Sequence, residues 1–120
     1  MADSVLFVSW GTPVRGLEAR GLEVFNEALG ILGRMQQEGR IEGFDVVLLQ
    51  PNGSLGGYIT AKGSAEQITE LRADDEFRRN TIEASLIVDD LAHIEGFTNE
   101  GVAREMERYQ EAISRVPQRA

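Results

Sequence analysis

The chain has 120 residues, of which 42% are hydrophobic, a formal net charge of −8 and no cysteine. This length and composition predict one globular domain, and they exclude disulfides, zinc–thiolate sites and thiol nucleophiles. The negative charge argues against nucleic-acid binding. The N-terminus has neither the basic residues of a signal peptide nor an apolar run long enough to span a membrane, so we expect a cytoplasmic protein.

The first element expected is a strand over residues 4–10 (SVLFVSW), which is almost entirely apolar and is followed by Gly-Thr-Pro. Apolar residues then recur at spacings of three and four, which predicts a helix over residues 17–37. Gly39 is placed to end that helix.

Two strands are expected next, over residues 44–50 and 55–62, separated by Asn52-Gly53. This dipeptide is typical of a two-residue hairpin turn in which both residues have positive φ, although the glycines that follow leave the loop length open. The glycines of this segment precede a strand, whereas a dinucleotide-binding loop opens a helix, and the lysine and glycine of a Walker motif stand here in reverse order. We therefore interpret them as hairpin glycines.

Ser64 is expected to begin a helix, because Gln67 three residues later completes a capping box. Asp74 can cap a further helical stretch that reaches about residue 85, so this region is either one broken helix or two short helices. A fourth strand is expected over residues 86–97.

The last predicted element is a helix that begins after Thr98 or Asn99 and ends at Pro117. Its apolar residues form one stripe, made of Val102, Met106, Tyr109, Ile113 and Val116. The resulting order, β-α-β-β-α-β with a C-terminal helix, predicts a ferredoxin-like α+β fold. Its antiparallel sheet has the strand order 4-1-3-2 and both crossover helices on one face.

Helices on one face leave the other sheet face uncovered, and alternation sorts the strand residues into two sets. We expect the larger, mixed sets on this open face, and they are Tyr58, Thr60 and Lys62 in the third strand and Leu91, His93, Glu95 and Phe97 in the fourth. For the first strand, alternation leaves open whether the open face receives Phe7 and Ser9 or Leu6, Val8 and Trp10.

A partly apolar open face suggests two sheets packed face to face in a two-fold homodimer. The element order, with FVSWGTPVRG near the start, LRADDEFRRN in the second helical region and GFTNEG before the last helix, resembles bacterial members of the dimeric α/β-barrel group of ferredoxin-like proteins. That group includes antibiotic-biosynthesis monooxygenase-like, muconolactone isomerase-like and YCII-like families. The resemblance is to uncharacterised members. YCII-like families pair a histidine with an aspartate, and that pair has no match here, so no catalytic residue is carried over.

His93, the only histidine, is the candidate catalytic residue, because imidazole can act as a general base near neutral pH. The candidate ligand-binding residues are Tyr58, Trp10, Thr60, Glu95 and Arg15, which offer aromatic stacking, polar partners near the histidine and a cation for a carboxylate. Each of these residues also has a plainer interpretation as a core, interface or surface residue. A second histidine is missing, so no metal or other cofactor is expected.

The sequence therefore favours a small-molecule-binding protein or an enzyme that works without a cofactor, with its pocket between the open sheet face and the helices or a partner subunit. The alternative is a non-catalytic structural or regulatory homodimer whose open face is fully packed. Neither follows from the fold, because one fold serves many functions.

Overall fold

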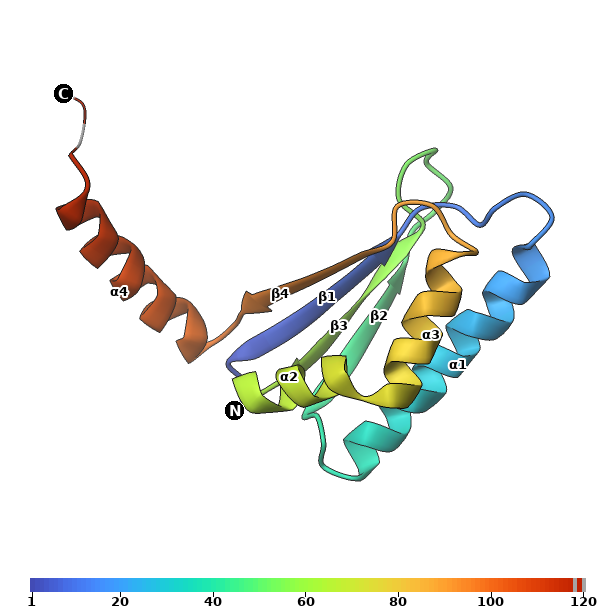
Figure 1. Ribbon diagram of the computed structural model, residues 1–120, viewed down its shortest axis with the longest axis horizontal. Coiled ribbons are helices and arrows are strands. Elements are labelled where there is room, and N and C mark those ends of the chain that lie inside the picture. Colours follow the sequence, from blue (N-terminus) through green and yellow to red (C-terminus); the bar gives the residue numbers. More distant parts are fainter. Residues whose placement is uncertain (118, 120) are drawn as a thin grey trace.

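The chain forms a four-stranded sheet with three helices along it and a fourth helix that stands apart (Figure 1). This computed structural model describes residues 1–117 and 119. In chain order the elements are β1 (Ser4–Trp10), α1 (Glu18–Gln37), β2 (Gly43–Leu48), β3 (Gly57–Gly63), α2 (Ala65–Ala73), α3 (Asp75–Ser85), β4 (Ala92–Phe97) and α4 (Glu100–Arg115).

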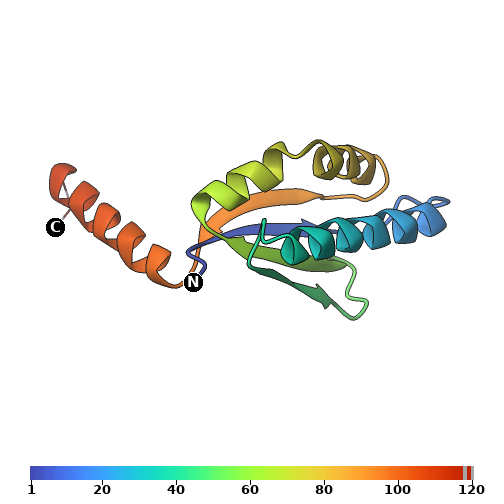
Figure 2. The same ribbon diagram turned by 90° about the horizontal axis from the view of Figure 1, so that it is seen from below.

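The strands pair in the order β2-β3-β1-β4, and each neighbouring pair is antiparallel. Helices α1, α2 and α3 lie on one side of the sheet (Figure 1; Figure 2). The strand order and the ferredoxin-like α+β arrangement expected from the sequence are thus confirmed. Within one chain the sheet is open and does not close into a barrel.

The core lies between the sheet and these three helices. Leu6 of β1 and Ile59 and Ala61 of β3 are buried on this side. They pack with buried apolar residues of the helices and of the loop after α1, namely Ile31, Leu32, Met35, Ile41, Ile68, Leu71 and Phe77. Because fully burying one such large side chain contributes roughly 1.5–3 kcal/mol, this layer holds the helices on the sheet.

The opposite face of the sheet carries Phe7 and Ser9 from β1 and Tyr58 and Thr60 from β3. The rings of Phe7 and Tyr58 lie with their centroids 5.3 Å apart. No helix among the described residues covers this open face (Figure 1). Of the two sets of β1 residues that alternation allowed, Phe7 and Ser9 are therefore the ones on the open face.

Two side-chain caps define the helices that follow β3. Ser64 Oγ accepts a hydrogen bond from the Gln67 amide at 3.1 Å, and Gln67 Oε1 accepts one from the Ser64 amide at 2.8 Å, which is the expected capping box. Asp74 interrupts the helical backbone with a ψ of 131°, and its carboxylate caps α3 by accepting from the Phe77 amide at 3.0 Å. This region is therefore two helices.

The loop between β2 and β3 is longer than the turn expected at Asn52-Gly53. It spans residues 49–56, and of the two turn residues Gly53 alone has a positive φ, of 76°. The Asn52 side chain organises the loop, since its Oδ1 accepts hydrogen bonds from the amides of Ser54 and Leu55, each at 2.9 Å. The type I′ turn is therefore wrong, although the interpretation of this segment as a hairpin connection holds.

The fourth strand begins later than expected, because residues 86–91 form a loop after α3. Asp89 exchanges backbone hydrogen bonds with the chain that leaves β1: the Gly11 amide donates to Asp89 O at 2.7 Å, and the Asp89 amide donates to Thr12 O at 2.9 Å. Asp90 then turns the chain with a φ of 56°. The apolar run before β4 is thus explained by contacts with this segment and not by a strand.

Helix α4 rises from one end of the sheet on the side of the open face (Figure 1). It is attached at its start, where Asn99 Nδ2 donates to Ala2 O at 2.6 Å and Arg104 forms an ion pair with Asp3. Gly101 lies so close to the Asp3 carbonyl that a Cβ there would clash. The expected helix is confirmed, with its apolar stripe exposed to solvent. Among the described residues, no helix is long and apolar enough to cross a membrane.

Candidate functional site

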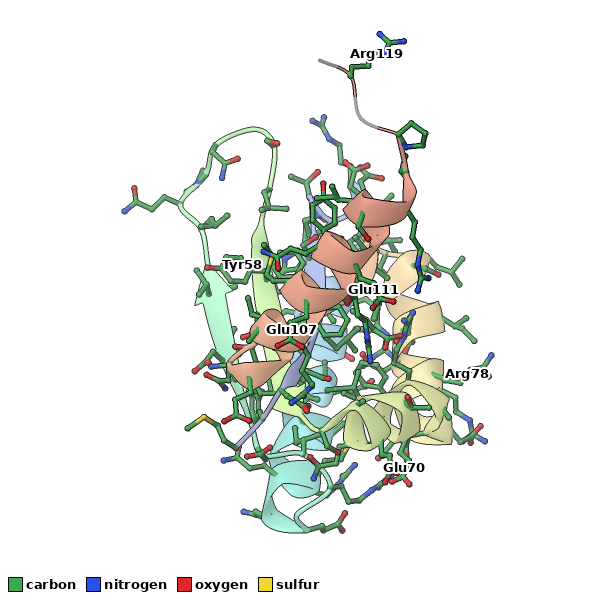
Figure 3. The ribbon with its side chains drawn as sticks, turned by 90° about the vertical axis from the view of Figure 1, so that its left-hand side faces the viewer. Tyr58, Glu70, Arg78, Glu107, Glu111 and Arg119 are labelled. Atoms are coloured by element: carbon green, nitrogen blue, oxygen red, sulfur yellow. The ribbon has the colours of Figure 1, made fainter. Side chains whose placement is uncertain are left out.

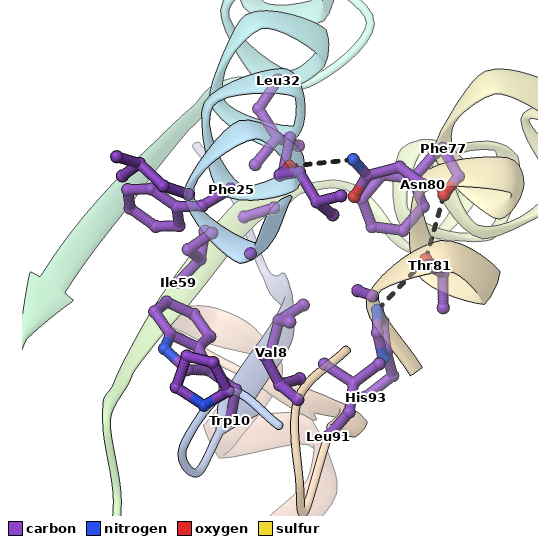
Figure 4. Close-up of a pocket in the computed structure, with 18 of the residues that line it drawn as sticks. Val8, Trp10, Phe25, Leu32, Ile59, Phe77, Asn80, Thr81, Leu91 and His93 are labelled. Carbon is purple, nitrogen blue, oxygen red and sulfur yellow. Dashed lines mark hydrogen bonds between the residues drawn. The ribbon is translucent and has the colours of Figure 1, made fainter. Parts of the chain in front are cut away.

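A cavity of about 330 Å³ lies between the helix-covered face of the sheet and helices α1 and α3 (Figure 4). Its wall is mostly apolar and includes Val8, Phe25, Ile59, Phe77 and Leu91. Leu22 and Leu48 also line it and are 63% and 66% exposed, so the cavity opens to solvent beside them. Its size and lining are those of a site for a small apolar ligand.

Trp10 forms one wall of the cavity and is held there by close packing. Its ring lies 5.6 Å from the ring of Phe25, centroid to centroid. On its other side are Gly56 and Gly57, where a Cβ would come within 3.0 Å of the indole. A Cβ would lie closer still to a backbone carbonyl, that of Gly11 for Gly56 and that of Val47 for Gly57, so both positions need glycine for the backbone and the indole to approach.

His93 is placed at the wall by β4 and is engaged by α3. It stands directly opposite Val8 in the register of β1 and β4, and its ring meets the ring of Phe77 edge-on at 5.9 Å. Thr81 Oγ1 lies 3.4 Å from Nε2 of His93 and donates its own hydrogen to Phe77 O at 3.0 Å (Figure 4).

This arrangement favours one tautomer of His93. Thr81 Oγ1 lies closer to Phe77 O than to Nε2 of His93, and when its hydroxyl donates to Phe77 O, Nε2 is the donor to Thr81 Oγ1. A neutral imidazole then carries its lone pair on Nδ1, which makes Nδ1 a hydrogen-bond acceptor and a potential base.

The surroundings also favour the neutral form of His93. Burial of the half-buried ring, and then the positive charge of Arg72, lower the pKa of His93 below its ordinary value. The imidazole is therefore uncharged at neutral pH. An uncharged imidazole in an apolar wall can accept a hydrogen bond or a proton from a bound molecule.

The other polar side chains at the wall are Glu18, Asn80 and Thr81. The Asn80 amide is buried and donates to Val24 O at 3.0 Å, which ties α3 to α1. The Glu18 carboxylate stands near the exposed rim and accepts a hydrogen bond from the Gly16 amide at 2.8 Å. A second carboxylate in the same cavity would meet this negative charge, so the lining disfavours an acidic ligand.

The structure separates the residues that the sequence had grouped around His93. In the register of β1 and β4, His93 and Glu95 lie opposite Val8 and Leu6, so both point toward the helices. Tyr58 and Thr60 point to the open face on the other side of the sheet. The expected position of His93 on the open face, beside Tyr58, is therefore wrong, and the cavity that contains His93 lies on the helix-covered face instead. Alternation shows which residues share a face but not which face the helices cover.

Trp10 is therefore the one candidate ligand-binding residue that shares the cavity with His93. Glu95 forms an ion pair with Arg72 of α2, outside the cavity wall. Arg15 is exposed in the loop before α1 and does not line the cavity either. The described part of the chain contains no group of three or more His, Asp or Glu side chains that could hold a metal ion.

The sequence interpretation missed the contribution of α3 to the site. Phe77, Asn80, Thr81 and Ala84 all line the cavity, and their spacings of three, one and three place them on one helical face. That spacing is visible in the sequence. What it does not show is that this face lies over the histidine of β4.

No family model matches this chain, and no curated protein matches it. Several solved structures do match. One is a dimeric protein of unknown function with a ferredoxin-like fold from Bacteroides fragilis, at 10% identity and a TM-score of 0.59, covering 79% of this chain and 96% of that one. A dimeric ferredoxin-like protein of unknown function from Thermobifida fusca has 8% identity, a TM-score of 0.62 and coverages of 82% and 93%.

A third match is SnoaB, a cofactor-independent oxygenase from Streptomyces nogalater, with 14% identity, a TM-score of 0.58 and coverages of 82% and 93%. At these identities the shared property is the fold. The chain thus has the fold of the dimeric ferredoxin-like group that its sequence resembles, and the fold alone assigns no activity.

Proposed function

We propose that this protein binds an uncharged, largely apolar small molecule in the cavity beneath α1 and α3. The observation that carries the proposal is a cavity of about 330 Å³ with an apolar lining and one neutral imidazole in its wall. Nδ1 of His93 accepts a hydrogen bond from a hydroxyl of the ligand, and Trp10 packs against the apolar part.

The same geometry supports catalysis by proton abstraction. A base near neutral pH must reach the proton that it removes, and Nδ1 of His93 has its lone pair available once Nε2 donates to Thr81. Thr81 then acts as a positioning residue for His93, because its Oγ1 lies between Phe77 O and Nε2 of the imidazole. The fold shared with a cofactor-independent oxygenase indicates that such a scaffold can carry chemistry without a cofactor.

Three probes of matched size test this function: 4-propylphenol, propylbenzene and 4-propylbenzoate. Trp10 is the only tryptophan, so its fluorescence reports binding at the cavity wall. We expect the phenol to bind about tenfold more tightly than propylbenzene, because one hydrogen bond contributes about 1–1.5 kcal/mol, and the carboxylate to bind least.

The variant His93→Phe keeps an aromatic ring but removes the acceptor. It should abolish the preference for the phenol and retain binding of propylbenzene. Tyr58→Phe, on the opposite sheet face, is the matched control and should leave all three affinities unchanged. If the wild type binds none of the probes, or if His93→Phe retains the preference, the assignment of the cavity is wrong.

We also propose that the protein is a homodimer in which a second copy covers the open sheet face. Phe7, Tyr58 and Val47 form the apolar centre of this face, and Ile94 beside them is 56% exposed. Large apolar areas of this kind are typical of interfaces between protein chains. Two structural neighbours are dimeric, which supports a homodimer.

Light scattering at micromolar concentration tests the dimer. The variant Ile94→Glu places an unpaired charge in the proposed interface and should produce monomers, whereas Asp45→Asn, at the edge of the same face and paired with Lys62 at 2.7 Å, should remain dimeric. A wild-type monomer at these concentrations would contradict the proposed homodimer without affecting the proposal of ligand binding in the cavity.

A further inference from the structure

Helix α4 presents an apolar stripe to solvent. Val102, Met106 and Tyr109 follow one another at spacings of four and three, which places them on one side of the helix. Met106 is 52% exposed and Tyr109 is 62% exposed. An isolated helix of this length is marginally stable in water, and most helical stability in proteins comes from packing an amphipathic face. The stripe therefore requires a covering surface.

The stripe points into the space between α4 and the open sheet face. Figure 3 views the molecule from the α4 end, and there Glu107 and Glu111 lie on the side of α4 that is turned away from the sheet. Residues two positions apart on a helix point about 200° apart, so Tyr109, which lies midway between these glutamates in sequence, points to the opposite side. The apolar side of α4 and the open face thus border the same space (Figure 1).

The chain has an extended shape and exposes more surface than a compact monomeric protein of the same size exposes. Its radius of gyration is 16.9 Å, whereas a compact domain of the same length has one of about 13.6 Å. Its accessible surface is 8120 Å², against about 6,500 Å² for a monomeric protein of its mass. The excess of roughly 1,600 Å² per chain is the amount that a large, permanent dimer interface buries from each subunit.

We infer that α4 of each chain packs its apolar stripe against a second copy of the chain, the same copy that covers the open face. The inference rests on the homodimer proposed above, and two-fold symmetry makes the contact reciprocal, so that each copy is held between the sheet and α4 of the other. A lipid surface is a poorer occupant, because α4 carries four glutamates and three arginines, whereas membrane-surface helices have an excess of basic residues.

Sedimentation velocity over a series of protein concentrations tests this contact. Met106→Glu places a charge in the stripe and should weaken the dimer at least tenfold, since an unpaired charge is costly to bury. Ala103→Glu places the same charge on the outer side of α4 and should leave the dimer unchanged. Hydrogen exchange provides a second readout: the α4 amides should be protected in the wild-type dimer and exchange rapidly in Met106→Glu.

The outcomes separate this inference from the proposed open-face dimer. A dimer that dissociates with Ile94→Glu but not with Met106→Glu overturns the role of α4 and leaves the open-face interface in place. If only Met106→Glu dissociates the dimer, the inferred α4 contact is supported and the open-face interface is overturned. A monomeric wild type, or binding of α4 to anionic vesicles with no change in self-association, overturns the inference.

Discussion

Filling the cavity should stabilise the protein and abolish ligand binding together. Ala84 of α3 lines the cavity, and Ala84→Leu adds three carbon atoms to a space of about 330 Å³. Burying three such groups contributes at most about 2.4 kcal/mol, from which the lost rotamer freedom of leucine removes about 0.5–1 kcal/mol. The expected gain in the free energy of unfolding is therefore about 1.5 kcal/mol.

Thermal unfolding followed by circular dichroism measures this gain. For a chain of 120 residues, 1 kcal/mol corresponds to about 4 °C, so Tm should rise by about 6 °C. The protein concentration must be the same for both proteins, because Tm of a dimer depends on it. Ala19→Leu, at an exposed position of α1, is the matched control and should shift Tm by no more than about 2 °C.

The ligand response of Ala84→Leu completes the test. Leucine occupies the space that the alkylphenol would fill, so the change in Trp10 fluorescence on adding 4-propylphenol should disappear. A variant that loses stability would mean that the cavity is too tightly bounded to admit the side chain. A stabilised variant with unchanged ligand affinity would show that the ligand binds elsewhere, and this would refute the proposed site.

Three further predictions concern single side chains. Burial lowers the pKa of His93, so between that pKa and about 6.5 the unfolded state binds a proton that the folded state does not. The free energy of unfolding should therefore be constant above pH 7 and fall on acidification toward pH 5, by at most about 1.4 kcal/mol per pH unit. In urea titrations His93→Phe should remove this dependence. Gly57→Ala should lower stability by about 1–3 kcal/mol and shift the fluorescence of Trp10, because its Cβ would lie 2.9 Å from the indole, whereas Gly30→Ala, with open space around it, should stabilise α1 by nearly 1 kcal/mol. Asp74→Ala should cost about 1 kcal/mol through loss of the α3 cap, and Asp74→Asn, which retains a capping oxygen, should cost less.

The sequence predicted the features that depend on neighbouring residues. The capping box of Ser64, the cap at Asp74 and the helix end near Gly39 each follow from a few adjacent positions, and the structure contains all three. The order of strands also followed, because few topologies satisfy right-handed crossovers with short connections. The two-residue turn at Asn52-Gly53 is the exception. The Asn52 side chain forms four hydrogen bonds that stabilise a longer loop than this dipeptide suggests.

The site was harder to predict because its partners come from distant segments. His93 and Glu95 are polar, so their strand set was assigned to the open face. The helices supply partners for that set: Arg72 of α2 pairs with Glu95, which stays exposed, and Thr81 of α3 lies 3.4 Å from Nε2 of the half-buried His93. Neither partner can be identified without knowing how α2 and α3 lie on the sheet. His93 does line the cavity, and its catalytic role stays a prediction.

The joint at the start of α4 sets the geometry of any assembly that this helix enters. Its direction depends on Asn99, with a φ of 51°, and on the contact of Gly101 with Asp3. A helix of 16 residues is about 24 Å long, so a change of 10° at this joint moves its far end by about 4 Å. Substitutions at these two positions would therefore redirect α4, and with it any second copy packed on this helix, without changing a residue of its apolar stripe.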